Sequence, residues 1–533
     1  MGTAHADTFA RDHLPPRSAW PDLRFTLPEL AYPERLNAAS VLLGEARFED
    51  RPCVVGVSGT WTYAELRAHA EGVAAVLVDD EGLVPGNRVL LHGPNSPELI
   101  ACWFGILLAG GVVVATMPLL RAGELAKVIE KAQVSHALAD ADAAGEVRRA
   151  AEAQPVLQRL REYGRGDEFF PRAEGFRAVE THAEDVSIIA FTSGTTGVPK
   201  GCVHFHRDLL AVCDTFSARV LRPREEDVFT ATPPLAFTFG LGVSVLFPMR
   251  AGAATVPIGQ PSLEAVVDTI ERYSVTTLST APTMYRAMLR GADPARVRSL
   301  RACVSAGEPL PAAVASAWTE RTGVRIIDGI GSTEMLHIFI GSPAEETRPG
   351  SVGRPVPGYE AAVVDEELRP LGAGAVGRLA VRGPTGCRYL DDPRQSNYVV
   401  GGWNLTGDAF RVDEDGYFWF AARNDDLIIS SGYNISPLEV EGALLEHDSV
   451  AECAVVASPD AERGHVVKAF VVASDAVAPG ADLVAELQEH VKRRIAPYKY
   501  PRRIAFVDAL PRTPTGKVQR AVLREREQEA AEV

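Results

Sequence analysis

Short apolar runs and longer helical stretches alternate along more than half of this chain. Between about residues 61 and 338, short apolar runs such as 87–92 and 324–327 lie next to stretches with helical patterning, such as 312–321. This alternation is typical of parallel sheets that are covered by helices. The sequence therefore predicts an α/β fold with a large N-terminal part built from helix-covered, mostly parallel sheets.

The pattern changes twice further along the chain. Between 350 and 420 it consists of short strands separated by glycine and proline turns, for example at 377–383, which predicts a small barrel or sheet attached to the α/β body. After Asp425 a compact order of helix, strands and helices begins, and it ends in a Glu-rich helix. We therefore expect an N-terminal domain over 1–424 and a small α+β domain over 425–533.

Charge and cysteine content limit the partners of the protein. The 533-residue chain has a formal net charge of -16, so it would repel nucleic acids and anionic membranes unless it carried a local basic patch. Its 7 cysteines form no C-x-x-C pair, and their odd number favours reduced thiols in a cytoplasm over disulfides or a zinc site. We expect a cytoplasmic monomer or homodimer with no nucleic-acid or membrane partner.

One uncharged run requires a choice between a membrane span and a buried core. Leu99–Leu120 is long enough to cross a bilayer. Gly110 and Gly111 divide it into an apolar helix that begins near Pro97 and a strand at 113–115, which is the pattern of a buried helix followed by a buried parallel strand. We expect the second arrangement, and the N-terminus lacks the apolar segment of a signal peptide.

The stretch Thr192–Gly201 follows a predicted buried strand at 186–191 and can form a phosphate-binding loop. Its glycines let backbone N–H groups approach an anion, its hydroxyls add donors, and Lys200 adds a positive charge. The Walker pattern of NTPases is not met, because Gly201 follows Lys200 where Ser or Thr is required. Composition alone would favour an ordinary flexible turn. The loop residues expected to contact nucleotide are Thr192, Ser193, Gly194, Thr195, Thr196 and Gly197.

This loop and its strand resemble the signature segment of the adenylate-forming superfamily, which contains acyl-CoA synthetases, peptide-synthetase adenylation domains and luciferases. Other elements of that superfamily follow in the right order from Trp61-Thr62-Tyr63 to Lys517. The resemblance implies an enzyme that uses ATP and Mg²⁺ to activate a carboxylic acid as its acyl-adenylate and then transfers the acyl group to coenzyme A. It also implies a mobile C-terminal domain that rotates about a hinge at Asp425.

The resemblance assigns nucleotide contacts to further segments. Thr333 would touch phosphate, and Glu334 would hold Mg²⁺, which partly neutralises ATP before another anion attacks it. Asp408 would accept hydrogen bonds from the ribose hydroxyls, and Arg423 would reach ribose or phosphate, although Ala422 replaces the commoner glycine before it. The remaining expected contacts, which include the border of the adenine, are Gly307, Glu308, Pro309, Asp328, Gly329, Ile330, Gly331 and Ser332.

Lys517 lies on a predicted turn and resembles the lysine that enters the site for adenylation, where it would bridge the substrate carboxylate and the α-phosphate. The predicted catalytic set is Lys200, Thr333, Glu334 and Lys517. Since a thiol can attack the adenylate directly, no protein nucleophile is required and no cysteine receives a catalytic role. The residues expected along the path of coenzyme A are Ser431, Gly432 and Tyr433.

Two segments are expected to enclose the acid. Phe237–Gly242 supplies flat apolar walls, and His337 would point to the same side as Glu334 if a helix began at Thr333. Taken singly, these phenylalanines fit plain core packing and the histidine fits a buried, hydrogen-bonded residue. The expected pocket consists of Phe237, Thr238, Phe239, Gly240, Ala306, Gly331 and His337.

The segments 329–339 and 239–242 closely resemble benzoate-CoA ligases and their relatives, which implies an aromatic acid. The N-terminal stretches 7–17 and 32–37 are more similar to the 2-aminobenzoate-CoA ligases of that group. No side chain that would recognise an ortho amine can be named from the sequence, so the expectation of 2-aminobenzoate rests on resemblance alone.

Other functions stay open on the sequence. A stand-alone adenylation enzyme that loads an aryl acid onto a carrier protein would use the same first step, and so would a luciferase-like oxygenase. A non-catalytic nucleotide-binding protein on the same fold is an alternative of another class. The joint presence of Lys200, Glu334, Asp408 and Lys517 argues against that last alternative.

Overall fold

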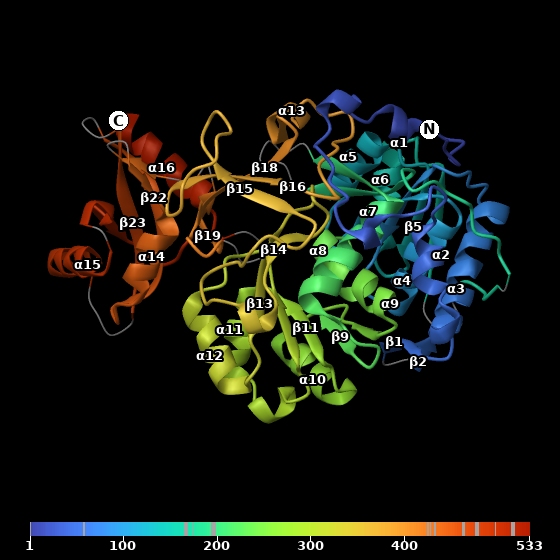
Figure 1. Ribbon diagram of the computed structural model, residues 1–533, viewed down its shortest axis with the longest axis horizontal. Helices are drawn as coiled ribbons and strands as arrows, with labels where there is room; N and C mark the ends of the chain where they lie inside the picture. The colour runs from blue at the N-terminus through green and yellow to red at the C-terminus, as the bar shows by residue number, and fades with distance from the viewer. Residues whose placement is uncertain are drawn as a thin grey trace. The chain divides into compact units, whose positions relative to one another are not determined.

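The computed structural model of the protein describes residues 2–56, 59–164, 169–173, 175–192, 199–423, 426, 428–430, 433–460, 464–474, 479–495, 497–512 and 518–532 (Figure 1). Two compact units are defined by the chain's internal contacts. Unit 1 consists of Met1–Ala361 and Val381–Asn404. Unit 2 consists of Ala362–Ala380 and Leu405–Val533.

Unit 1 contains a six-stranded sheet. Its strand order is β6 (Arg159–Tyr163), β5 (His136–Asp140), β3 (Arg88–His92), β4 (Val112–Thr116), β7 (Val186–Thr192) and β8 (Lys200–Phe205). All neighbouring strands are parallel except β7 and β8. The central strand β3 is buried along its whole length, as expected of a parallel strand with both faces covered.

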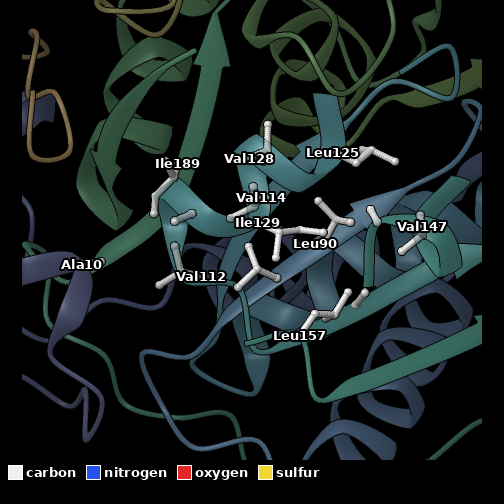
Figure 2. Packing of buried hydrophobic residues seen from close by; sticks show 14 of the residues in the cluster. Ala10, Leu90, Val112, Val114, Leu125, Val128, Ile129, Val147, Leu157 and Ile189 are labelled. Carbon is white, nitrogen blue, oxygen red and sulfur yellow. The ribbon is translucent and has the colours of Figure 1, made fainter. Parts of the chain in front are cut away.

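Amphipathic helices bury their apolar faces against this sheet. In α5 (Ala122–Ala132), the residues Leu125, Val128 and Ile129 have the spacing of one helix face and are buried. They belong to the same core cluster as Leu90 and residues of α6 (Ala144–Ala153) (Figure 2). Each such buried aliphatic side chain contributes about 1.5–3 kcal/mol to stability.

The uncharged run between 99 and 120 forms a buried helix and a strand, as predicted. Helix α4 spans Pro97–Leu108 and begins after Ser96, whose side chain accepts a hydrogen bond from the Leu99 N–H at 3.0 Å. Gly110, with a φ of 75°, then turns the chain toward β4. Within the described ranges, no helix is long and apolar enough to cross a membrane.

The second sheet of unit 1 has eight strands. Its order is β14 (Ile338–Gly341), β13 (Ile326–Gly331), β12 (Ala302–Ser305), β11 (Thr277–Thr280), β9 (Val228–Ala231), β10 (Ala254–Pro257), β1 (Pro52–Gly56) and β2 (Gly59–Thr62). The strands from β13 to β1 are parallel neighbours, whereas the edge strands β14 and β2 are antiparallel. The helices α10 (Leu263–Tyr273), α11 (Pro282–Gly291) and α12 (Ala312–Thr322) share a core cluster with this sheet.

Strand β13 is longer than the sequence predicted. Asp328–Gly331 was expected to follow the strand, but these residues lie within it. The reason is the edge strand β14, which pairs with Gly329, Ile330 and Gly331 and so extends β13 by its own hydrogen bonds.

Unit 1 contains seven further described α-helices. Helix α3 begins with a capping box, because Thr62 accepts from the Glu65 N–H while the Glu65 carboxylate accepts from the Thr62 N–H. π-Helical turns at Cys213–Leu221 and Gly242–Leu246 continue α7 and α8. The bounds are α1 Phe9–Asp12, α2 Ala38–Leu43, α3 Tyr63–Ala75, α7 His206–Val212, α8 Thr238–Leu241, α9 Phe247–Ala251 and α13 Gln395–Tyr398.

A small sheet occupies the region for which the sequence predicted a small barrel or sheet. Its strand order is β15 (Glu360–Val364), β16 (Val376–Arg382), β18 (Trp403–Val412) and β17 (Val399–Val400), and β19 (Phe418–Arg423) pairs with β18. The strands β18 and β19 are antiparallel, with Asp408 opposite Arg423.

The C-terminal part of unit 2 has an α+β arrangement. A sheet of β22 (Val450–Asp460), β23 (Gly464–Ala473) and β24 (Arg503–Phe506) accompanies a hairpin of β20 (Ile428–Ser430) and β21 (Tyr433–Ile435). Its helices are α14 (Pro437–Leu445), α15 (Ala481–Arg494) and α16 (Arg520–Glu532). The predicted fold class, with helix-covered, mostly parallel sheets, a small sheet and a C-terminal α+β part, is confirmed.

Candidate active site

A tight turn connects β13 to β14 and carries the predicted Thr333 and Glu334. The Met335 N–H donates to the Ser332 carbonyl at 3.2 Å, and the Leu336 N–H donates to the Thr333 carbonyl at 3.1 Å. No helix begins at Thr333, so the condition under which His337 and Glu334 would share a helix face is not met. The pairing of β14 with β13 takes the chain back after only a few residues, and a helix has no room to form.

A chain of hydrogen bonds joins Lys200 to Glu334. The Lys200 Nζ donates to the Tyr389 hydroxyl at 3.0 Å, and this hydroxyl donates to Glu334 Oε1 at 2.5 Å. Lys200 Nζ and Glu334 Oε1 are 3.7 Å apart, so the phenol bridges two opposite charges. Burial and then the Glu334 charge raise the pKa of Tyr389 far above its usual range, so the hydroxyl keeps its proton.

Backbone pairing brings Tyr389 to this position. Tyr389 forms an antiparallel bridge with Cys202 of β8, and the Leu390 N–H donates to the Gly201 carbonyl at 2.9 Å. Gln395 holds the segment from the other side, because its Oε1 accepts from the Tyr389 N–H at 2.9 Å. Tyr389 is not predicted from the sequence, since no local pattern indicates a contact between residues 189 positions apart.

Asp328 is a buried carboxyl within β13, opposite Ser305 of β12. Burial raises its pKa to about 8, so at pH 7 the group is mostly protonated and offers both a donor and an acceptor. Its Oδ1 has no hydrogen-bond partner within the described residues. The carboxyl borders a cavity of about 430 Å³, which is also lined by Leu310, Ala315, Thr319, Ser342 and Gly353. A paired donor and acceptor can recognise one edge of a nucleobase.

His337 lies in an aromatic enclosure. Its ring centroid is 4.6 Å from that of Phe247, 5.5 Å from that of Phe216 and 5.7 Å from that of Phe239. Gly242 closes one side, since a Cβ there would lie 2.3 Å from His337 Cδ2. Burial lowers the pKa of His337 to about 3, so the imidazole is neutral at physiological pH. Phe216 and Phe247 are not predicted from the sequence, because their π-helical and helical settings give no local signal of the contact with His337.

The other expected pocket residues have different environments. Phe237, just before α8, has 43% of its surface exposed, so it is not part of the closed aromatic enclosure. Thr238 is buried in α8. Gly240 packs so closely that a Cβ would lie 2.1 Å from the Pro234 carbonyl oxygen. Ala306 is buried directly after β12.

For several residues predicted to contact the nucleotide, the structure describes the strand pairing or the backbone conformation within the residue's own unit. In unit 1, Thr192 and Lys200 pair across β7 and β8, and Gly307 follows β12 with a φ of 86°, which glycine adopts without strain. In unit 2, Asp408 is buried, and Asp408 and Arg423 are paired across β18 and β19. The two residues expected at the ribose are therefore neighbours.

Part of the predicted set lies outside the described residues. These positions are Ser193, Gly194, Thr195, Thr196, Gly197, Asp425, Ser431, Gly432 and Lys517. For Tyr433 and Arg423 the structure describes the strand but not the side chain. The roles of all these residues stay predictions.

Comparisons with known proteins extend over almost the whole chain. The AMP-binding enzyme family matches residues 44–388, and the AMP-binding enzyme C-terminal domain matches residues 439–517. The benzoate-CoA ligase of Thauera aromatica is 35% identical over 514 residues, which cover 94% of this chain and 98% of that protein.

Two solved structures are similar in both fold and sequence. The anthranilate CoA ligase AuaEII, in complex with anthranoyl-AMP, has 33% identity and a TM-score of 0.86, with 95% of this chain and 100% of that chain covered. A benzoate CoA ligase from Burkholderia xenovorans LB400 has 32% identity and a TM-score of 0.81, with 92% and 100% covered. The chain therefore belongs to the AMP-binding enzymes and is an adenylate-forming, AMP-forming acid–CoA ligase of the benzoate-CoA ligase group.

Proposed function

We propose that the protein ligates an aromatic carboxylic acid, 2-aminobenzoate or benzoate, to coenzyme A in a Mg²⁺-dependent reaction that converts ATP to AMP and pyrophosphate. The observation that carries the aromatic substrate is the similarity in fold and sequence to two solved structures named as anthranilate and benzoate CoA ligases. The rigid, apolar rings of Phe216, Phe239 and Phe247 around His337 suit a wall beside an aryl ring better than one beside a flexible aliphatic chain.

In the first half-reaction, a carboxylate oxygen of the acid attacks the α-phosphorus of ATP. The bond from the α-phosphorus to the bridging oxygen breaks, and pyrophosphate leaves with the electron pair. Both reactants are anions, so catalysis depends on orientation and on cations placed where charge develops. Lys200 would bind phosphate, Lys517 would bridge the carboxylate and the α-phosphate, and Thr333 would donate to a phosphate oxygen.

Glu334 fits the role of a Mg²⁺ ligand. Mg²⁺ is usually held by one or two carboxylates together with substrate phosphates and water, rather than by a complete protein cage. Glu334 supplies one such carboxylate beside Lys200 and is itself 8% exposed. The ion would reduce the repulsion between the triphosphate and the acid.

In the second half-reaction, the thiol of coenzyme A attacks the acyl carbon, the bond from that carbon to the phosphate oxygen breaks, and AMP leaves. Lys517 would first have to withdraw, which is the reason to expect a rotation at Asp425. Ser431, Gly432 and Tyr433 would then line the path of the pantetheine arm, with Gly432 providing space.

His337 favours 2-aminobenzoate over benzoate. An imidazole with a pKa of about 3 is neutral, and its unprotonated nitrogen can accept a hydrogen bond. The Phe239 backbone carbonyl is within reach of one ring nitrogen, and the other nitrogen has no hydrogen-bond partner among the residues that the structure describes. An ortho amine on the ring would supply the missing donor, whereas unsubstituted benzoate would leave that nitrogen unpaired.

Thioester formation across a panel of acids tests this function. We expect 2-aminobenzoate and benzoate to exceed hydroxybenzoates, cinnamates and short aliphatic acids in kcat/KM, with AMP formed in equal amount. Preference for an aliphatic acid would overturn the aromatic assignment. Acylation of a pantetheine-bearing carrier protein instead of coenzyme A would reassign the acceptor, and failure to exchange labelled pyrophosphate into ATP with any aryl acid would contradict adenylation.

A further inference from the structure

The turn between β13 and β14 is held by side chains at four consecutive residues. Three of the four partners come from the segment Thr385–Tyr398, which we name the clamp segment, and the fourth comes from β8. The contacts are Tyr398 hydroxyl to Ser332 Oγ at 3.2 Å, His204 Nε2 to the Thr333 carbonyl at 2.7 Å, Tyr389 hydroxyl to Glu334 Oε1 at 2.5 Å and Thr385 Oγ1 to the Met335 carbonyl at 2.7 Å.

The backbone of this turn depends on those contacts. Leu336 has a φ of 71°, in the left-handed region that a non-glycine residue adopts only when its surroundings fix it. Three of the four partners are buried side chains, and the fourth, Tyr398, is 9% exposed. The position of Glu334 is therefore set by several contacts rather than by its own backbone preference.

Tyr389 differs from the other three partners, because it contacts a charged side chain and connects it to a second one. Its neutral hydroxyl accepts from the Lys200 ammonium and donates to the Glu334 carboxylate. Without that hydroxyl, two opposite charges only 3.7 Å apart in a largely buried setting would be drawn into direct contact. A direct ion pair would occupy both groups and would have to be broken by every incoming nucleotide.

The aromatic ring of Tyr389 is itself fixed. It packs edge-on against Tyr398, with the ring centroids 5.9 Å apart, and Lys200 Nζ lies 4.9 Å from the Tyr389 ring centroid. Gln395 anchors the backbone N–H of the same residue at 2.9 Å. The hydroxyl is thereby aimed between its two charged neighbours with little freedom to turn away.

We propose that Tyr389 is a positioning residue of the adenylation site, whose hydroxyl keeps the Lys200–Glu334 ion pair from closing to a direct hydrogen bond and so keeps both groups available to ATP and Mg²⁺. This inference rests on the proposed roles of Lys200 and Glu334 as ligands of phosphate and metal. It assigns Tyr389 no contact with the aryl acid, so acid binding and nucleotide binding should respond differently to its loss.

The variant Tyr389→Phe removes only the hydroxyl and keeps the ring that packs against Tyr398 and Lys200. We expect the Kd of MgATP, measured by titration calorimetry without acid and therefore without turnover, to rise about tenfold, the loss expected for one hydrogen bond to a charged group. The Mg²⁺ concentration that gives half-maximal ATP binding should rise with it, while the KM of the aryl acid stays within about twofold, a difference of only about 0.4 kcal/mol.

The matched control is Tyr63→Phe. The Tyr63 hydroxyl is also buried, but it donates to the backbone carbonyls of Pro248 at 3.2 Å and Ala253 at 2.8 Å rather than to a charged side chain of the adenylation site. We expect its loss to lower Tm without changing the Kd of MgATP. The rise in Tm on adding MgATP provides a second comparison of binding, which requires only folded protein.

Wild-type affinity and Mg²⁺ dependence in Tyr389→Phe would overturn the inference, and so would an equal loss of MgATP affinity in Tyr63→Phe, which would show a general effect of destabilisation. Failure of the wild-type protein to bind MgATP would instead contradict the proposed nucleotide roles of Lys200 and Glu334. The two failures are therefore distinguishable in one set of titrations.

Discussion

At the scale of single residues, Asp328 shows how burial changes a functional group. An exposed aspartate titrates near 3.8, and burial within β13 raises the pKa of Asp328 to about 8. The folded state therefore prefers the protonated carboxyl. As pH rises from about 4 toward 8, the unfolded chain loses the Asp328 proton before the folded protein does, so the free energy of unfolding falls. The fall is complete once pH exceeds the folded pKa.

The variant Asp328→Asn removes this titration while keeping a neutral group of similar shape. Because each pH unit within the window contributes at most about 1.4 kcal/mol, we expect the wild-type Tm to fall more steeply with pH than the variant Tm, and the variant to be the more stable protein above pH 8. Thermal unfolding between pH 5 and 9 measures this. Parallel curves for the two proteins would show that the Asp328 carboxyl is not held in its neutral form.

The same scale shows what sequence could and could not reveal about the candidate site. Resemblance assigned roles to Lys200 and Glu334, and their charged atoms lie 3.7 Å apart in the structure. Tyr389, His204 and Phe247 received no role in advance, because each acts through a tertiary neighbour far away in sequence. A tyrosine or phenylalanine in an apolar region has the same local pattern whether it packs in a core or borders a site.

At the scale of elements, the close packing of the π-helical turn Gly242–Leu246 against His337 limits which side chain can stand at position 242. The π-helical turn Gly242–Leu246 lies against the turn after β13, and a Cβ on Gly242 would lie 2.3 Å from His337 Cδ2 and 3.2 Å from Phe247 Cζ. The imidazole is enclosed by aromatic rings, so it has little space into which it can move.

In the variant Gly242→Ala the added methyl group would clash with His337. We expect the clash to force the imidazole or the π-helical turn out of position and so to impair recognition of the acid. We expect kcat/KM for the aryl acid to fall at least about tenfold, equivalent to about 1.4 kcal/mol, with little change in the KM of ATP. Gly145→Ala is the control, because nothing lies within 4 Å of a Cβ at that position of helix α6. It should raise stability by about 0.5–1 kcal/mol and leave kinetics unchanged. Normal kinetics in Gly242→Ala would contradict the assignment of His337 to the acid pocket.

Helices and strands were predictable from the sequence where the length of an apolar run and the residues that bound it indicated the same element. The run between 99 and 120 became α4 and β4, and the strand before the phosphate loop became β7, because continuous apolar segments bounded by glycines have few other solutions. The extension of β13 and the tight turn at Thr333 were not predictable. Both depend on the antiparallel pairing with β14, which only the tertiary fold establishes.

At the scale of the whole molecule, the proposed mechanism has the C-terminal domain change its contacts between the two half-reactions, and the predicted pivot is Asp425. The variant Asp425→Pro would restrict rotation there, because the proline ring fixes φ. We expect thioester formation to slow at least about tenfold more than adenylation, measured by acyl-CoA production and by pyrophosphate exchange on the same preparation. Equal slowing of both steps would place the pivot elsewhere.

The central claim is that the acid is activated as an acyl-adenylate before coenzyme A attacks. The most direct measurement uses 2-aminobenzoate labelled with ¹⁸O in both carboxylate oxygens, followed by mass spectrometry of the nucleotide product in unlabelled water. Since a carboxylate oxygen becomes bonded to the α-phosphorus and remains there when the thiol displaces AMP, the account predicts AMP that carries one ¹⁸O atom and a thioester that carries the other. Unlabelled AMP, or formation of ADP and phosphate in its place, would contradict it.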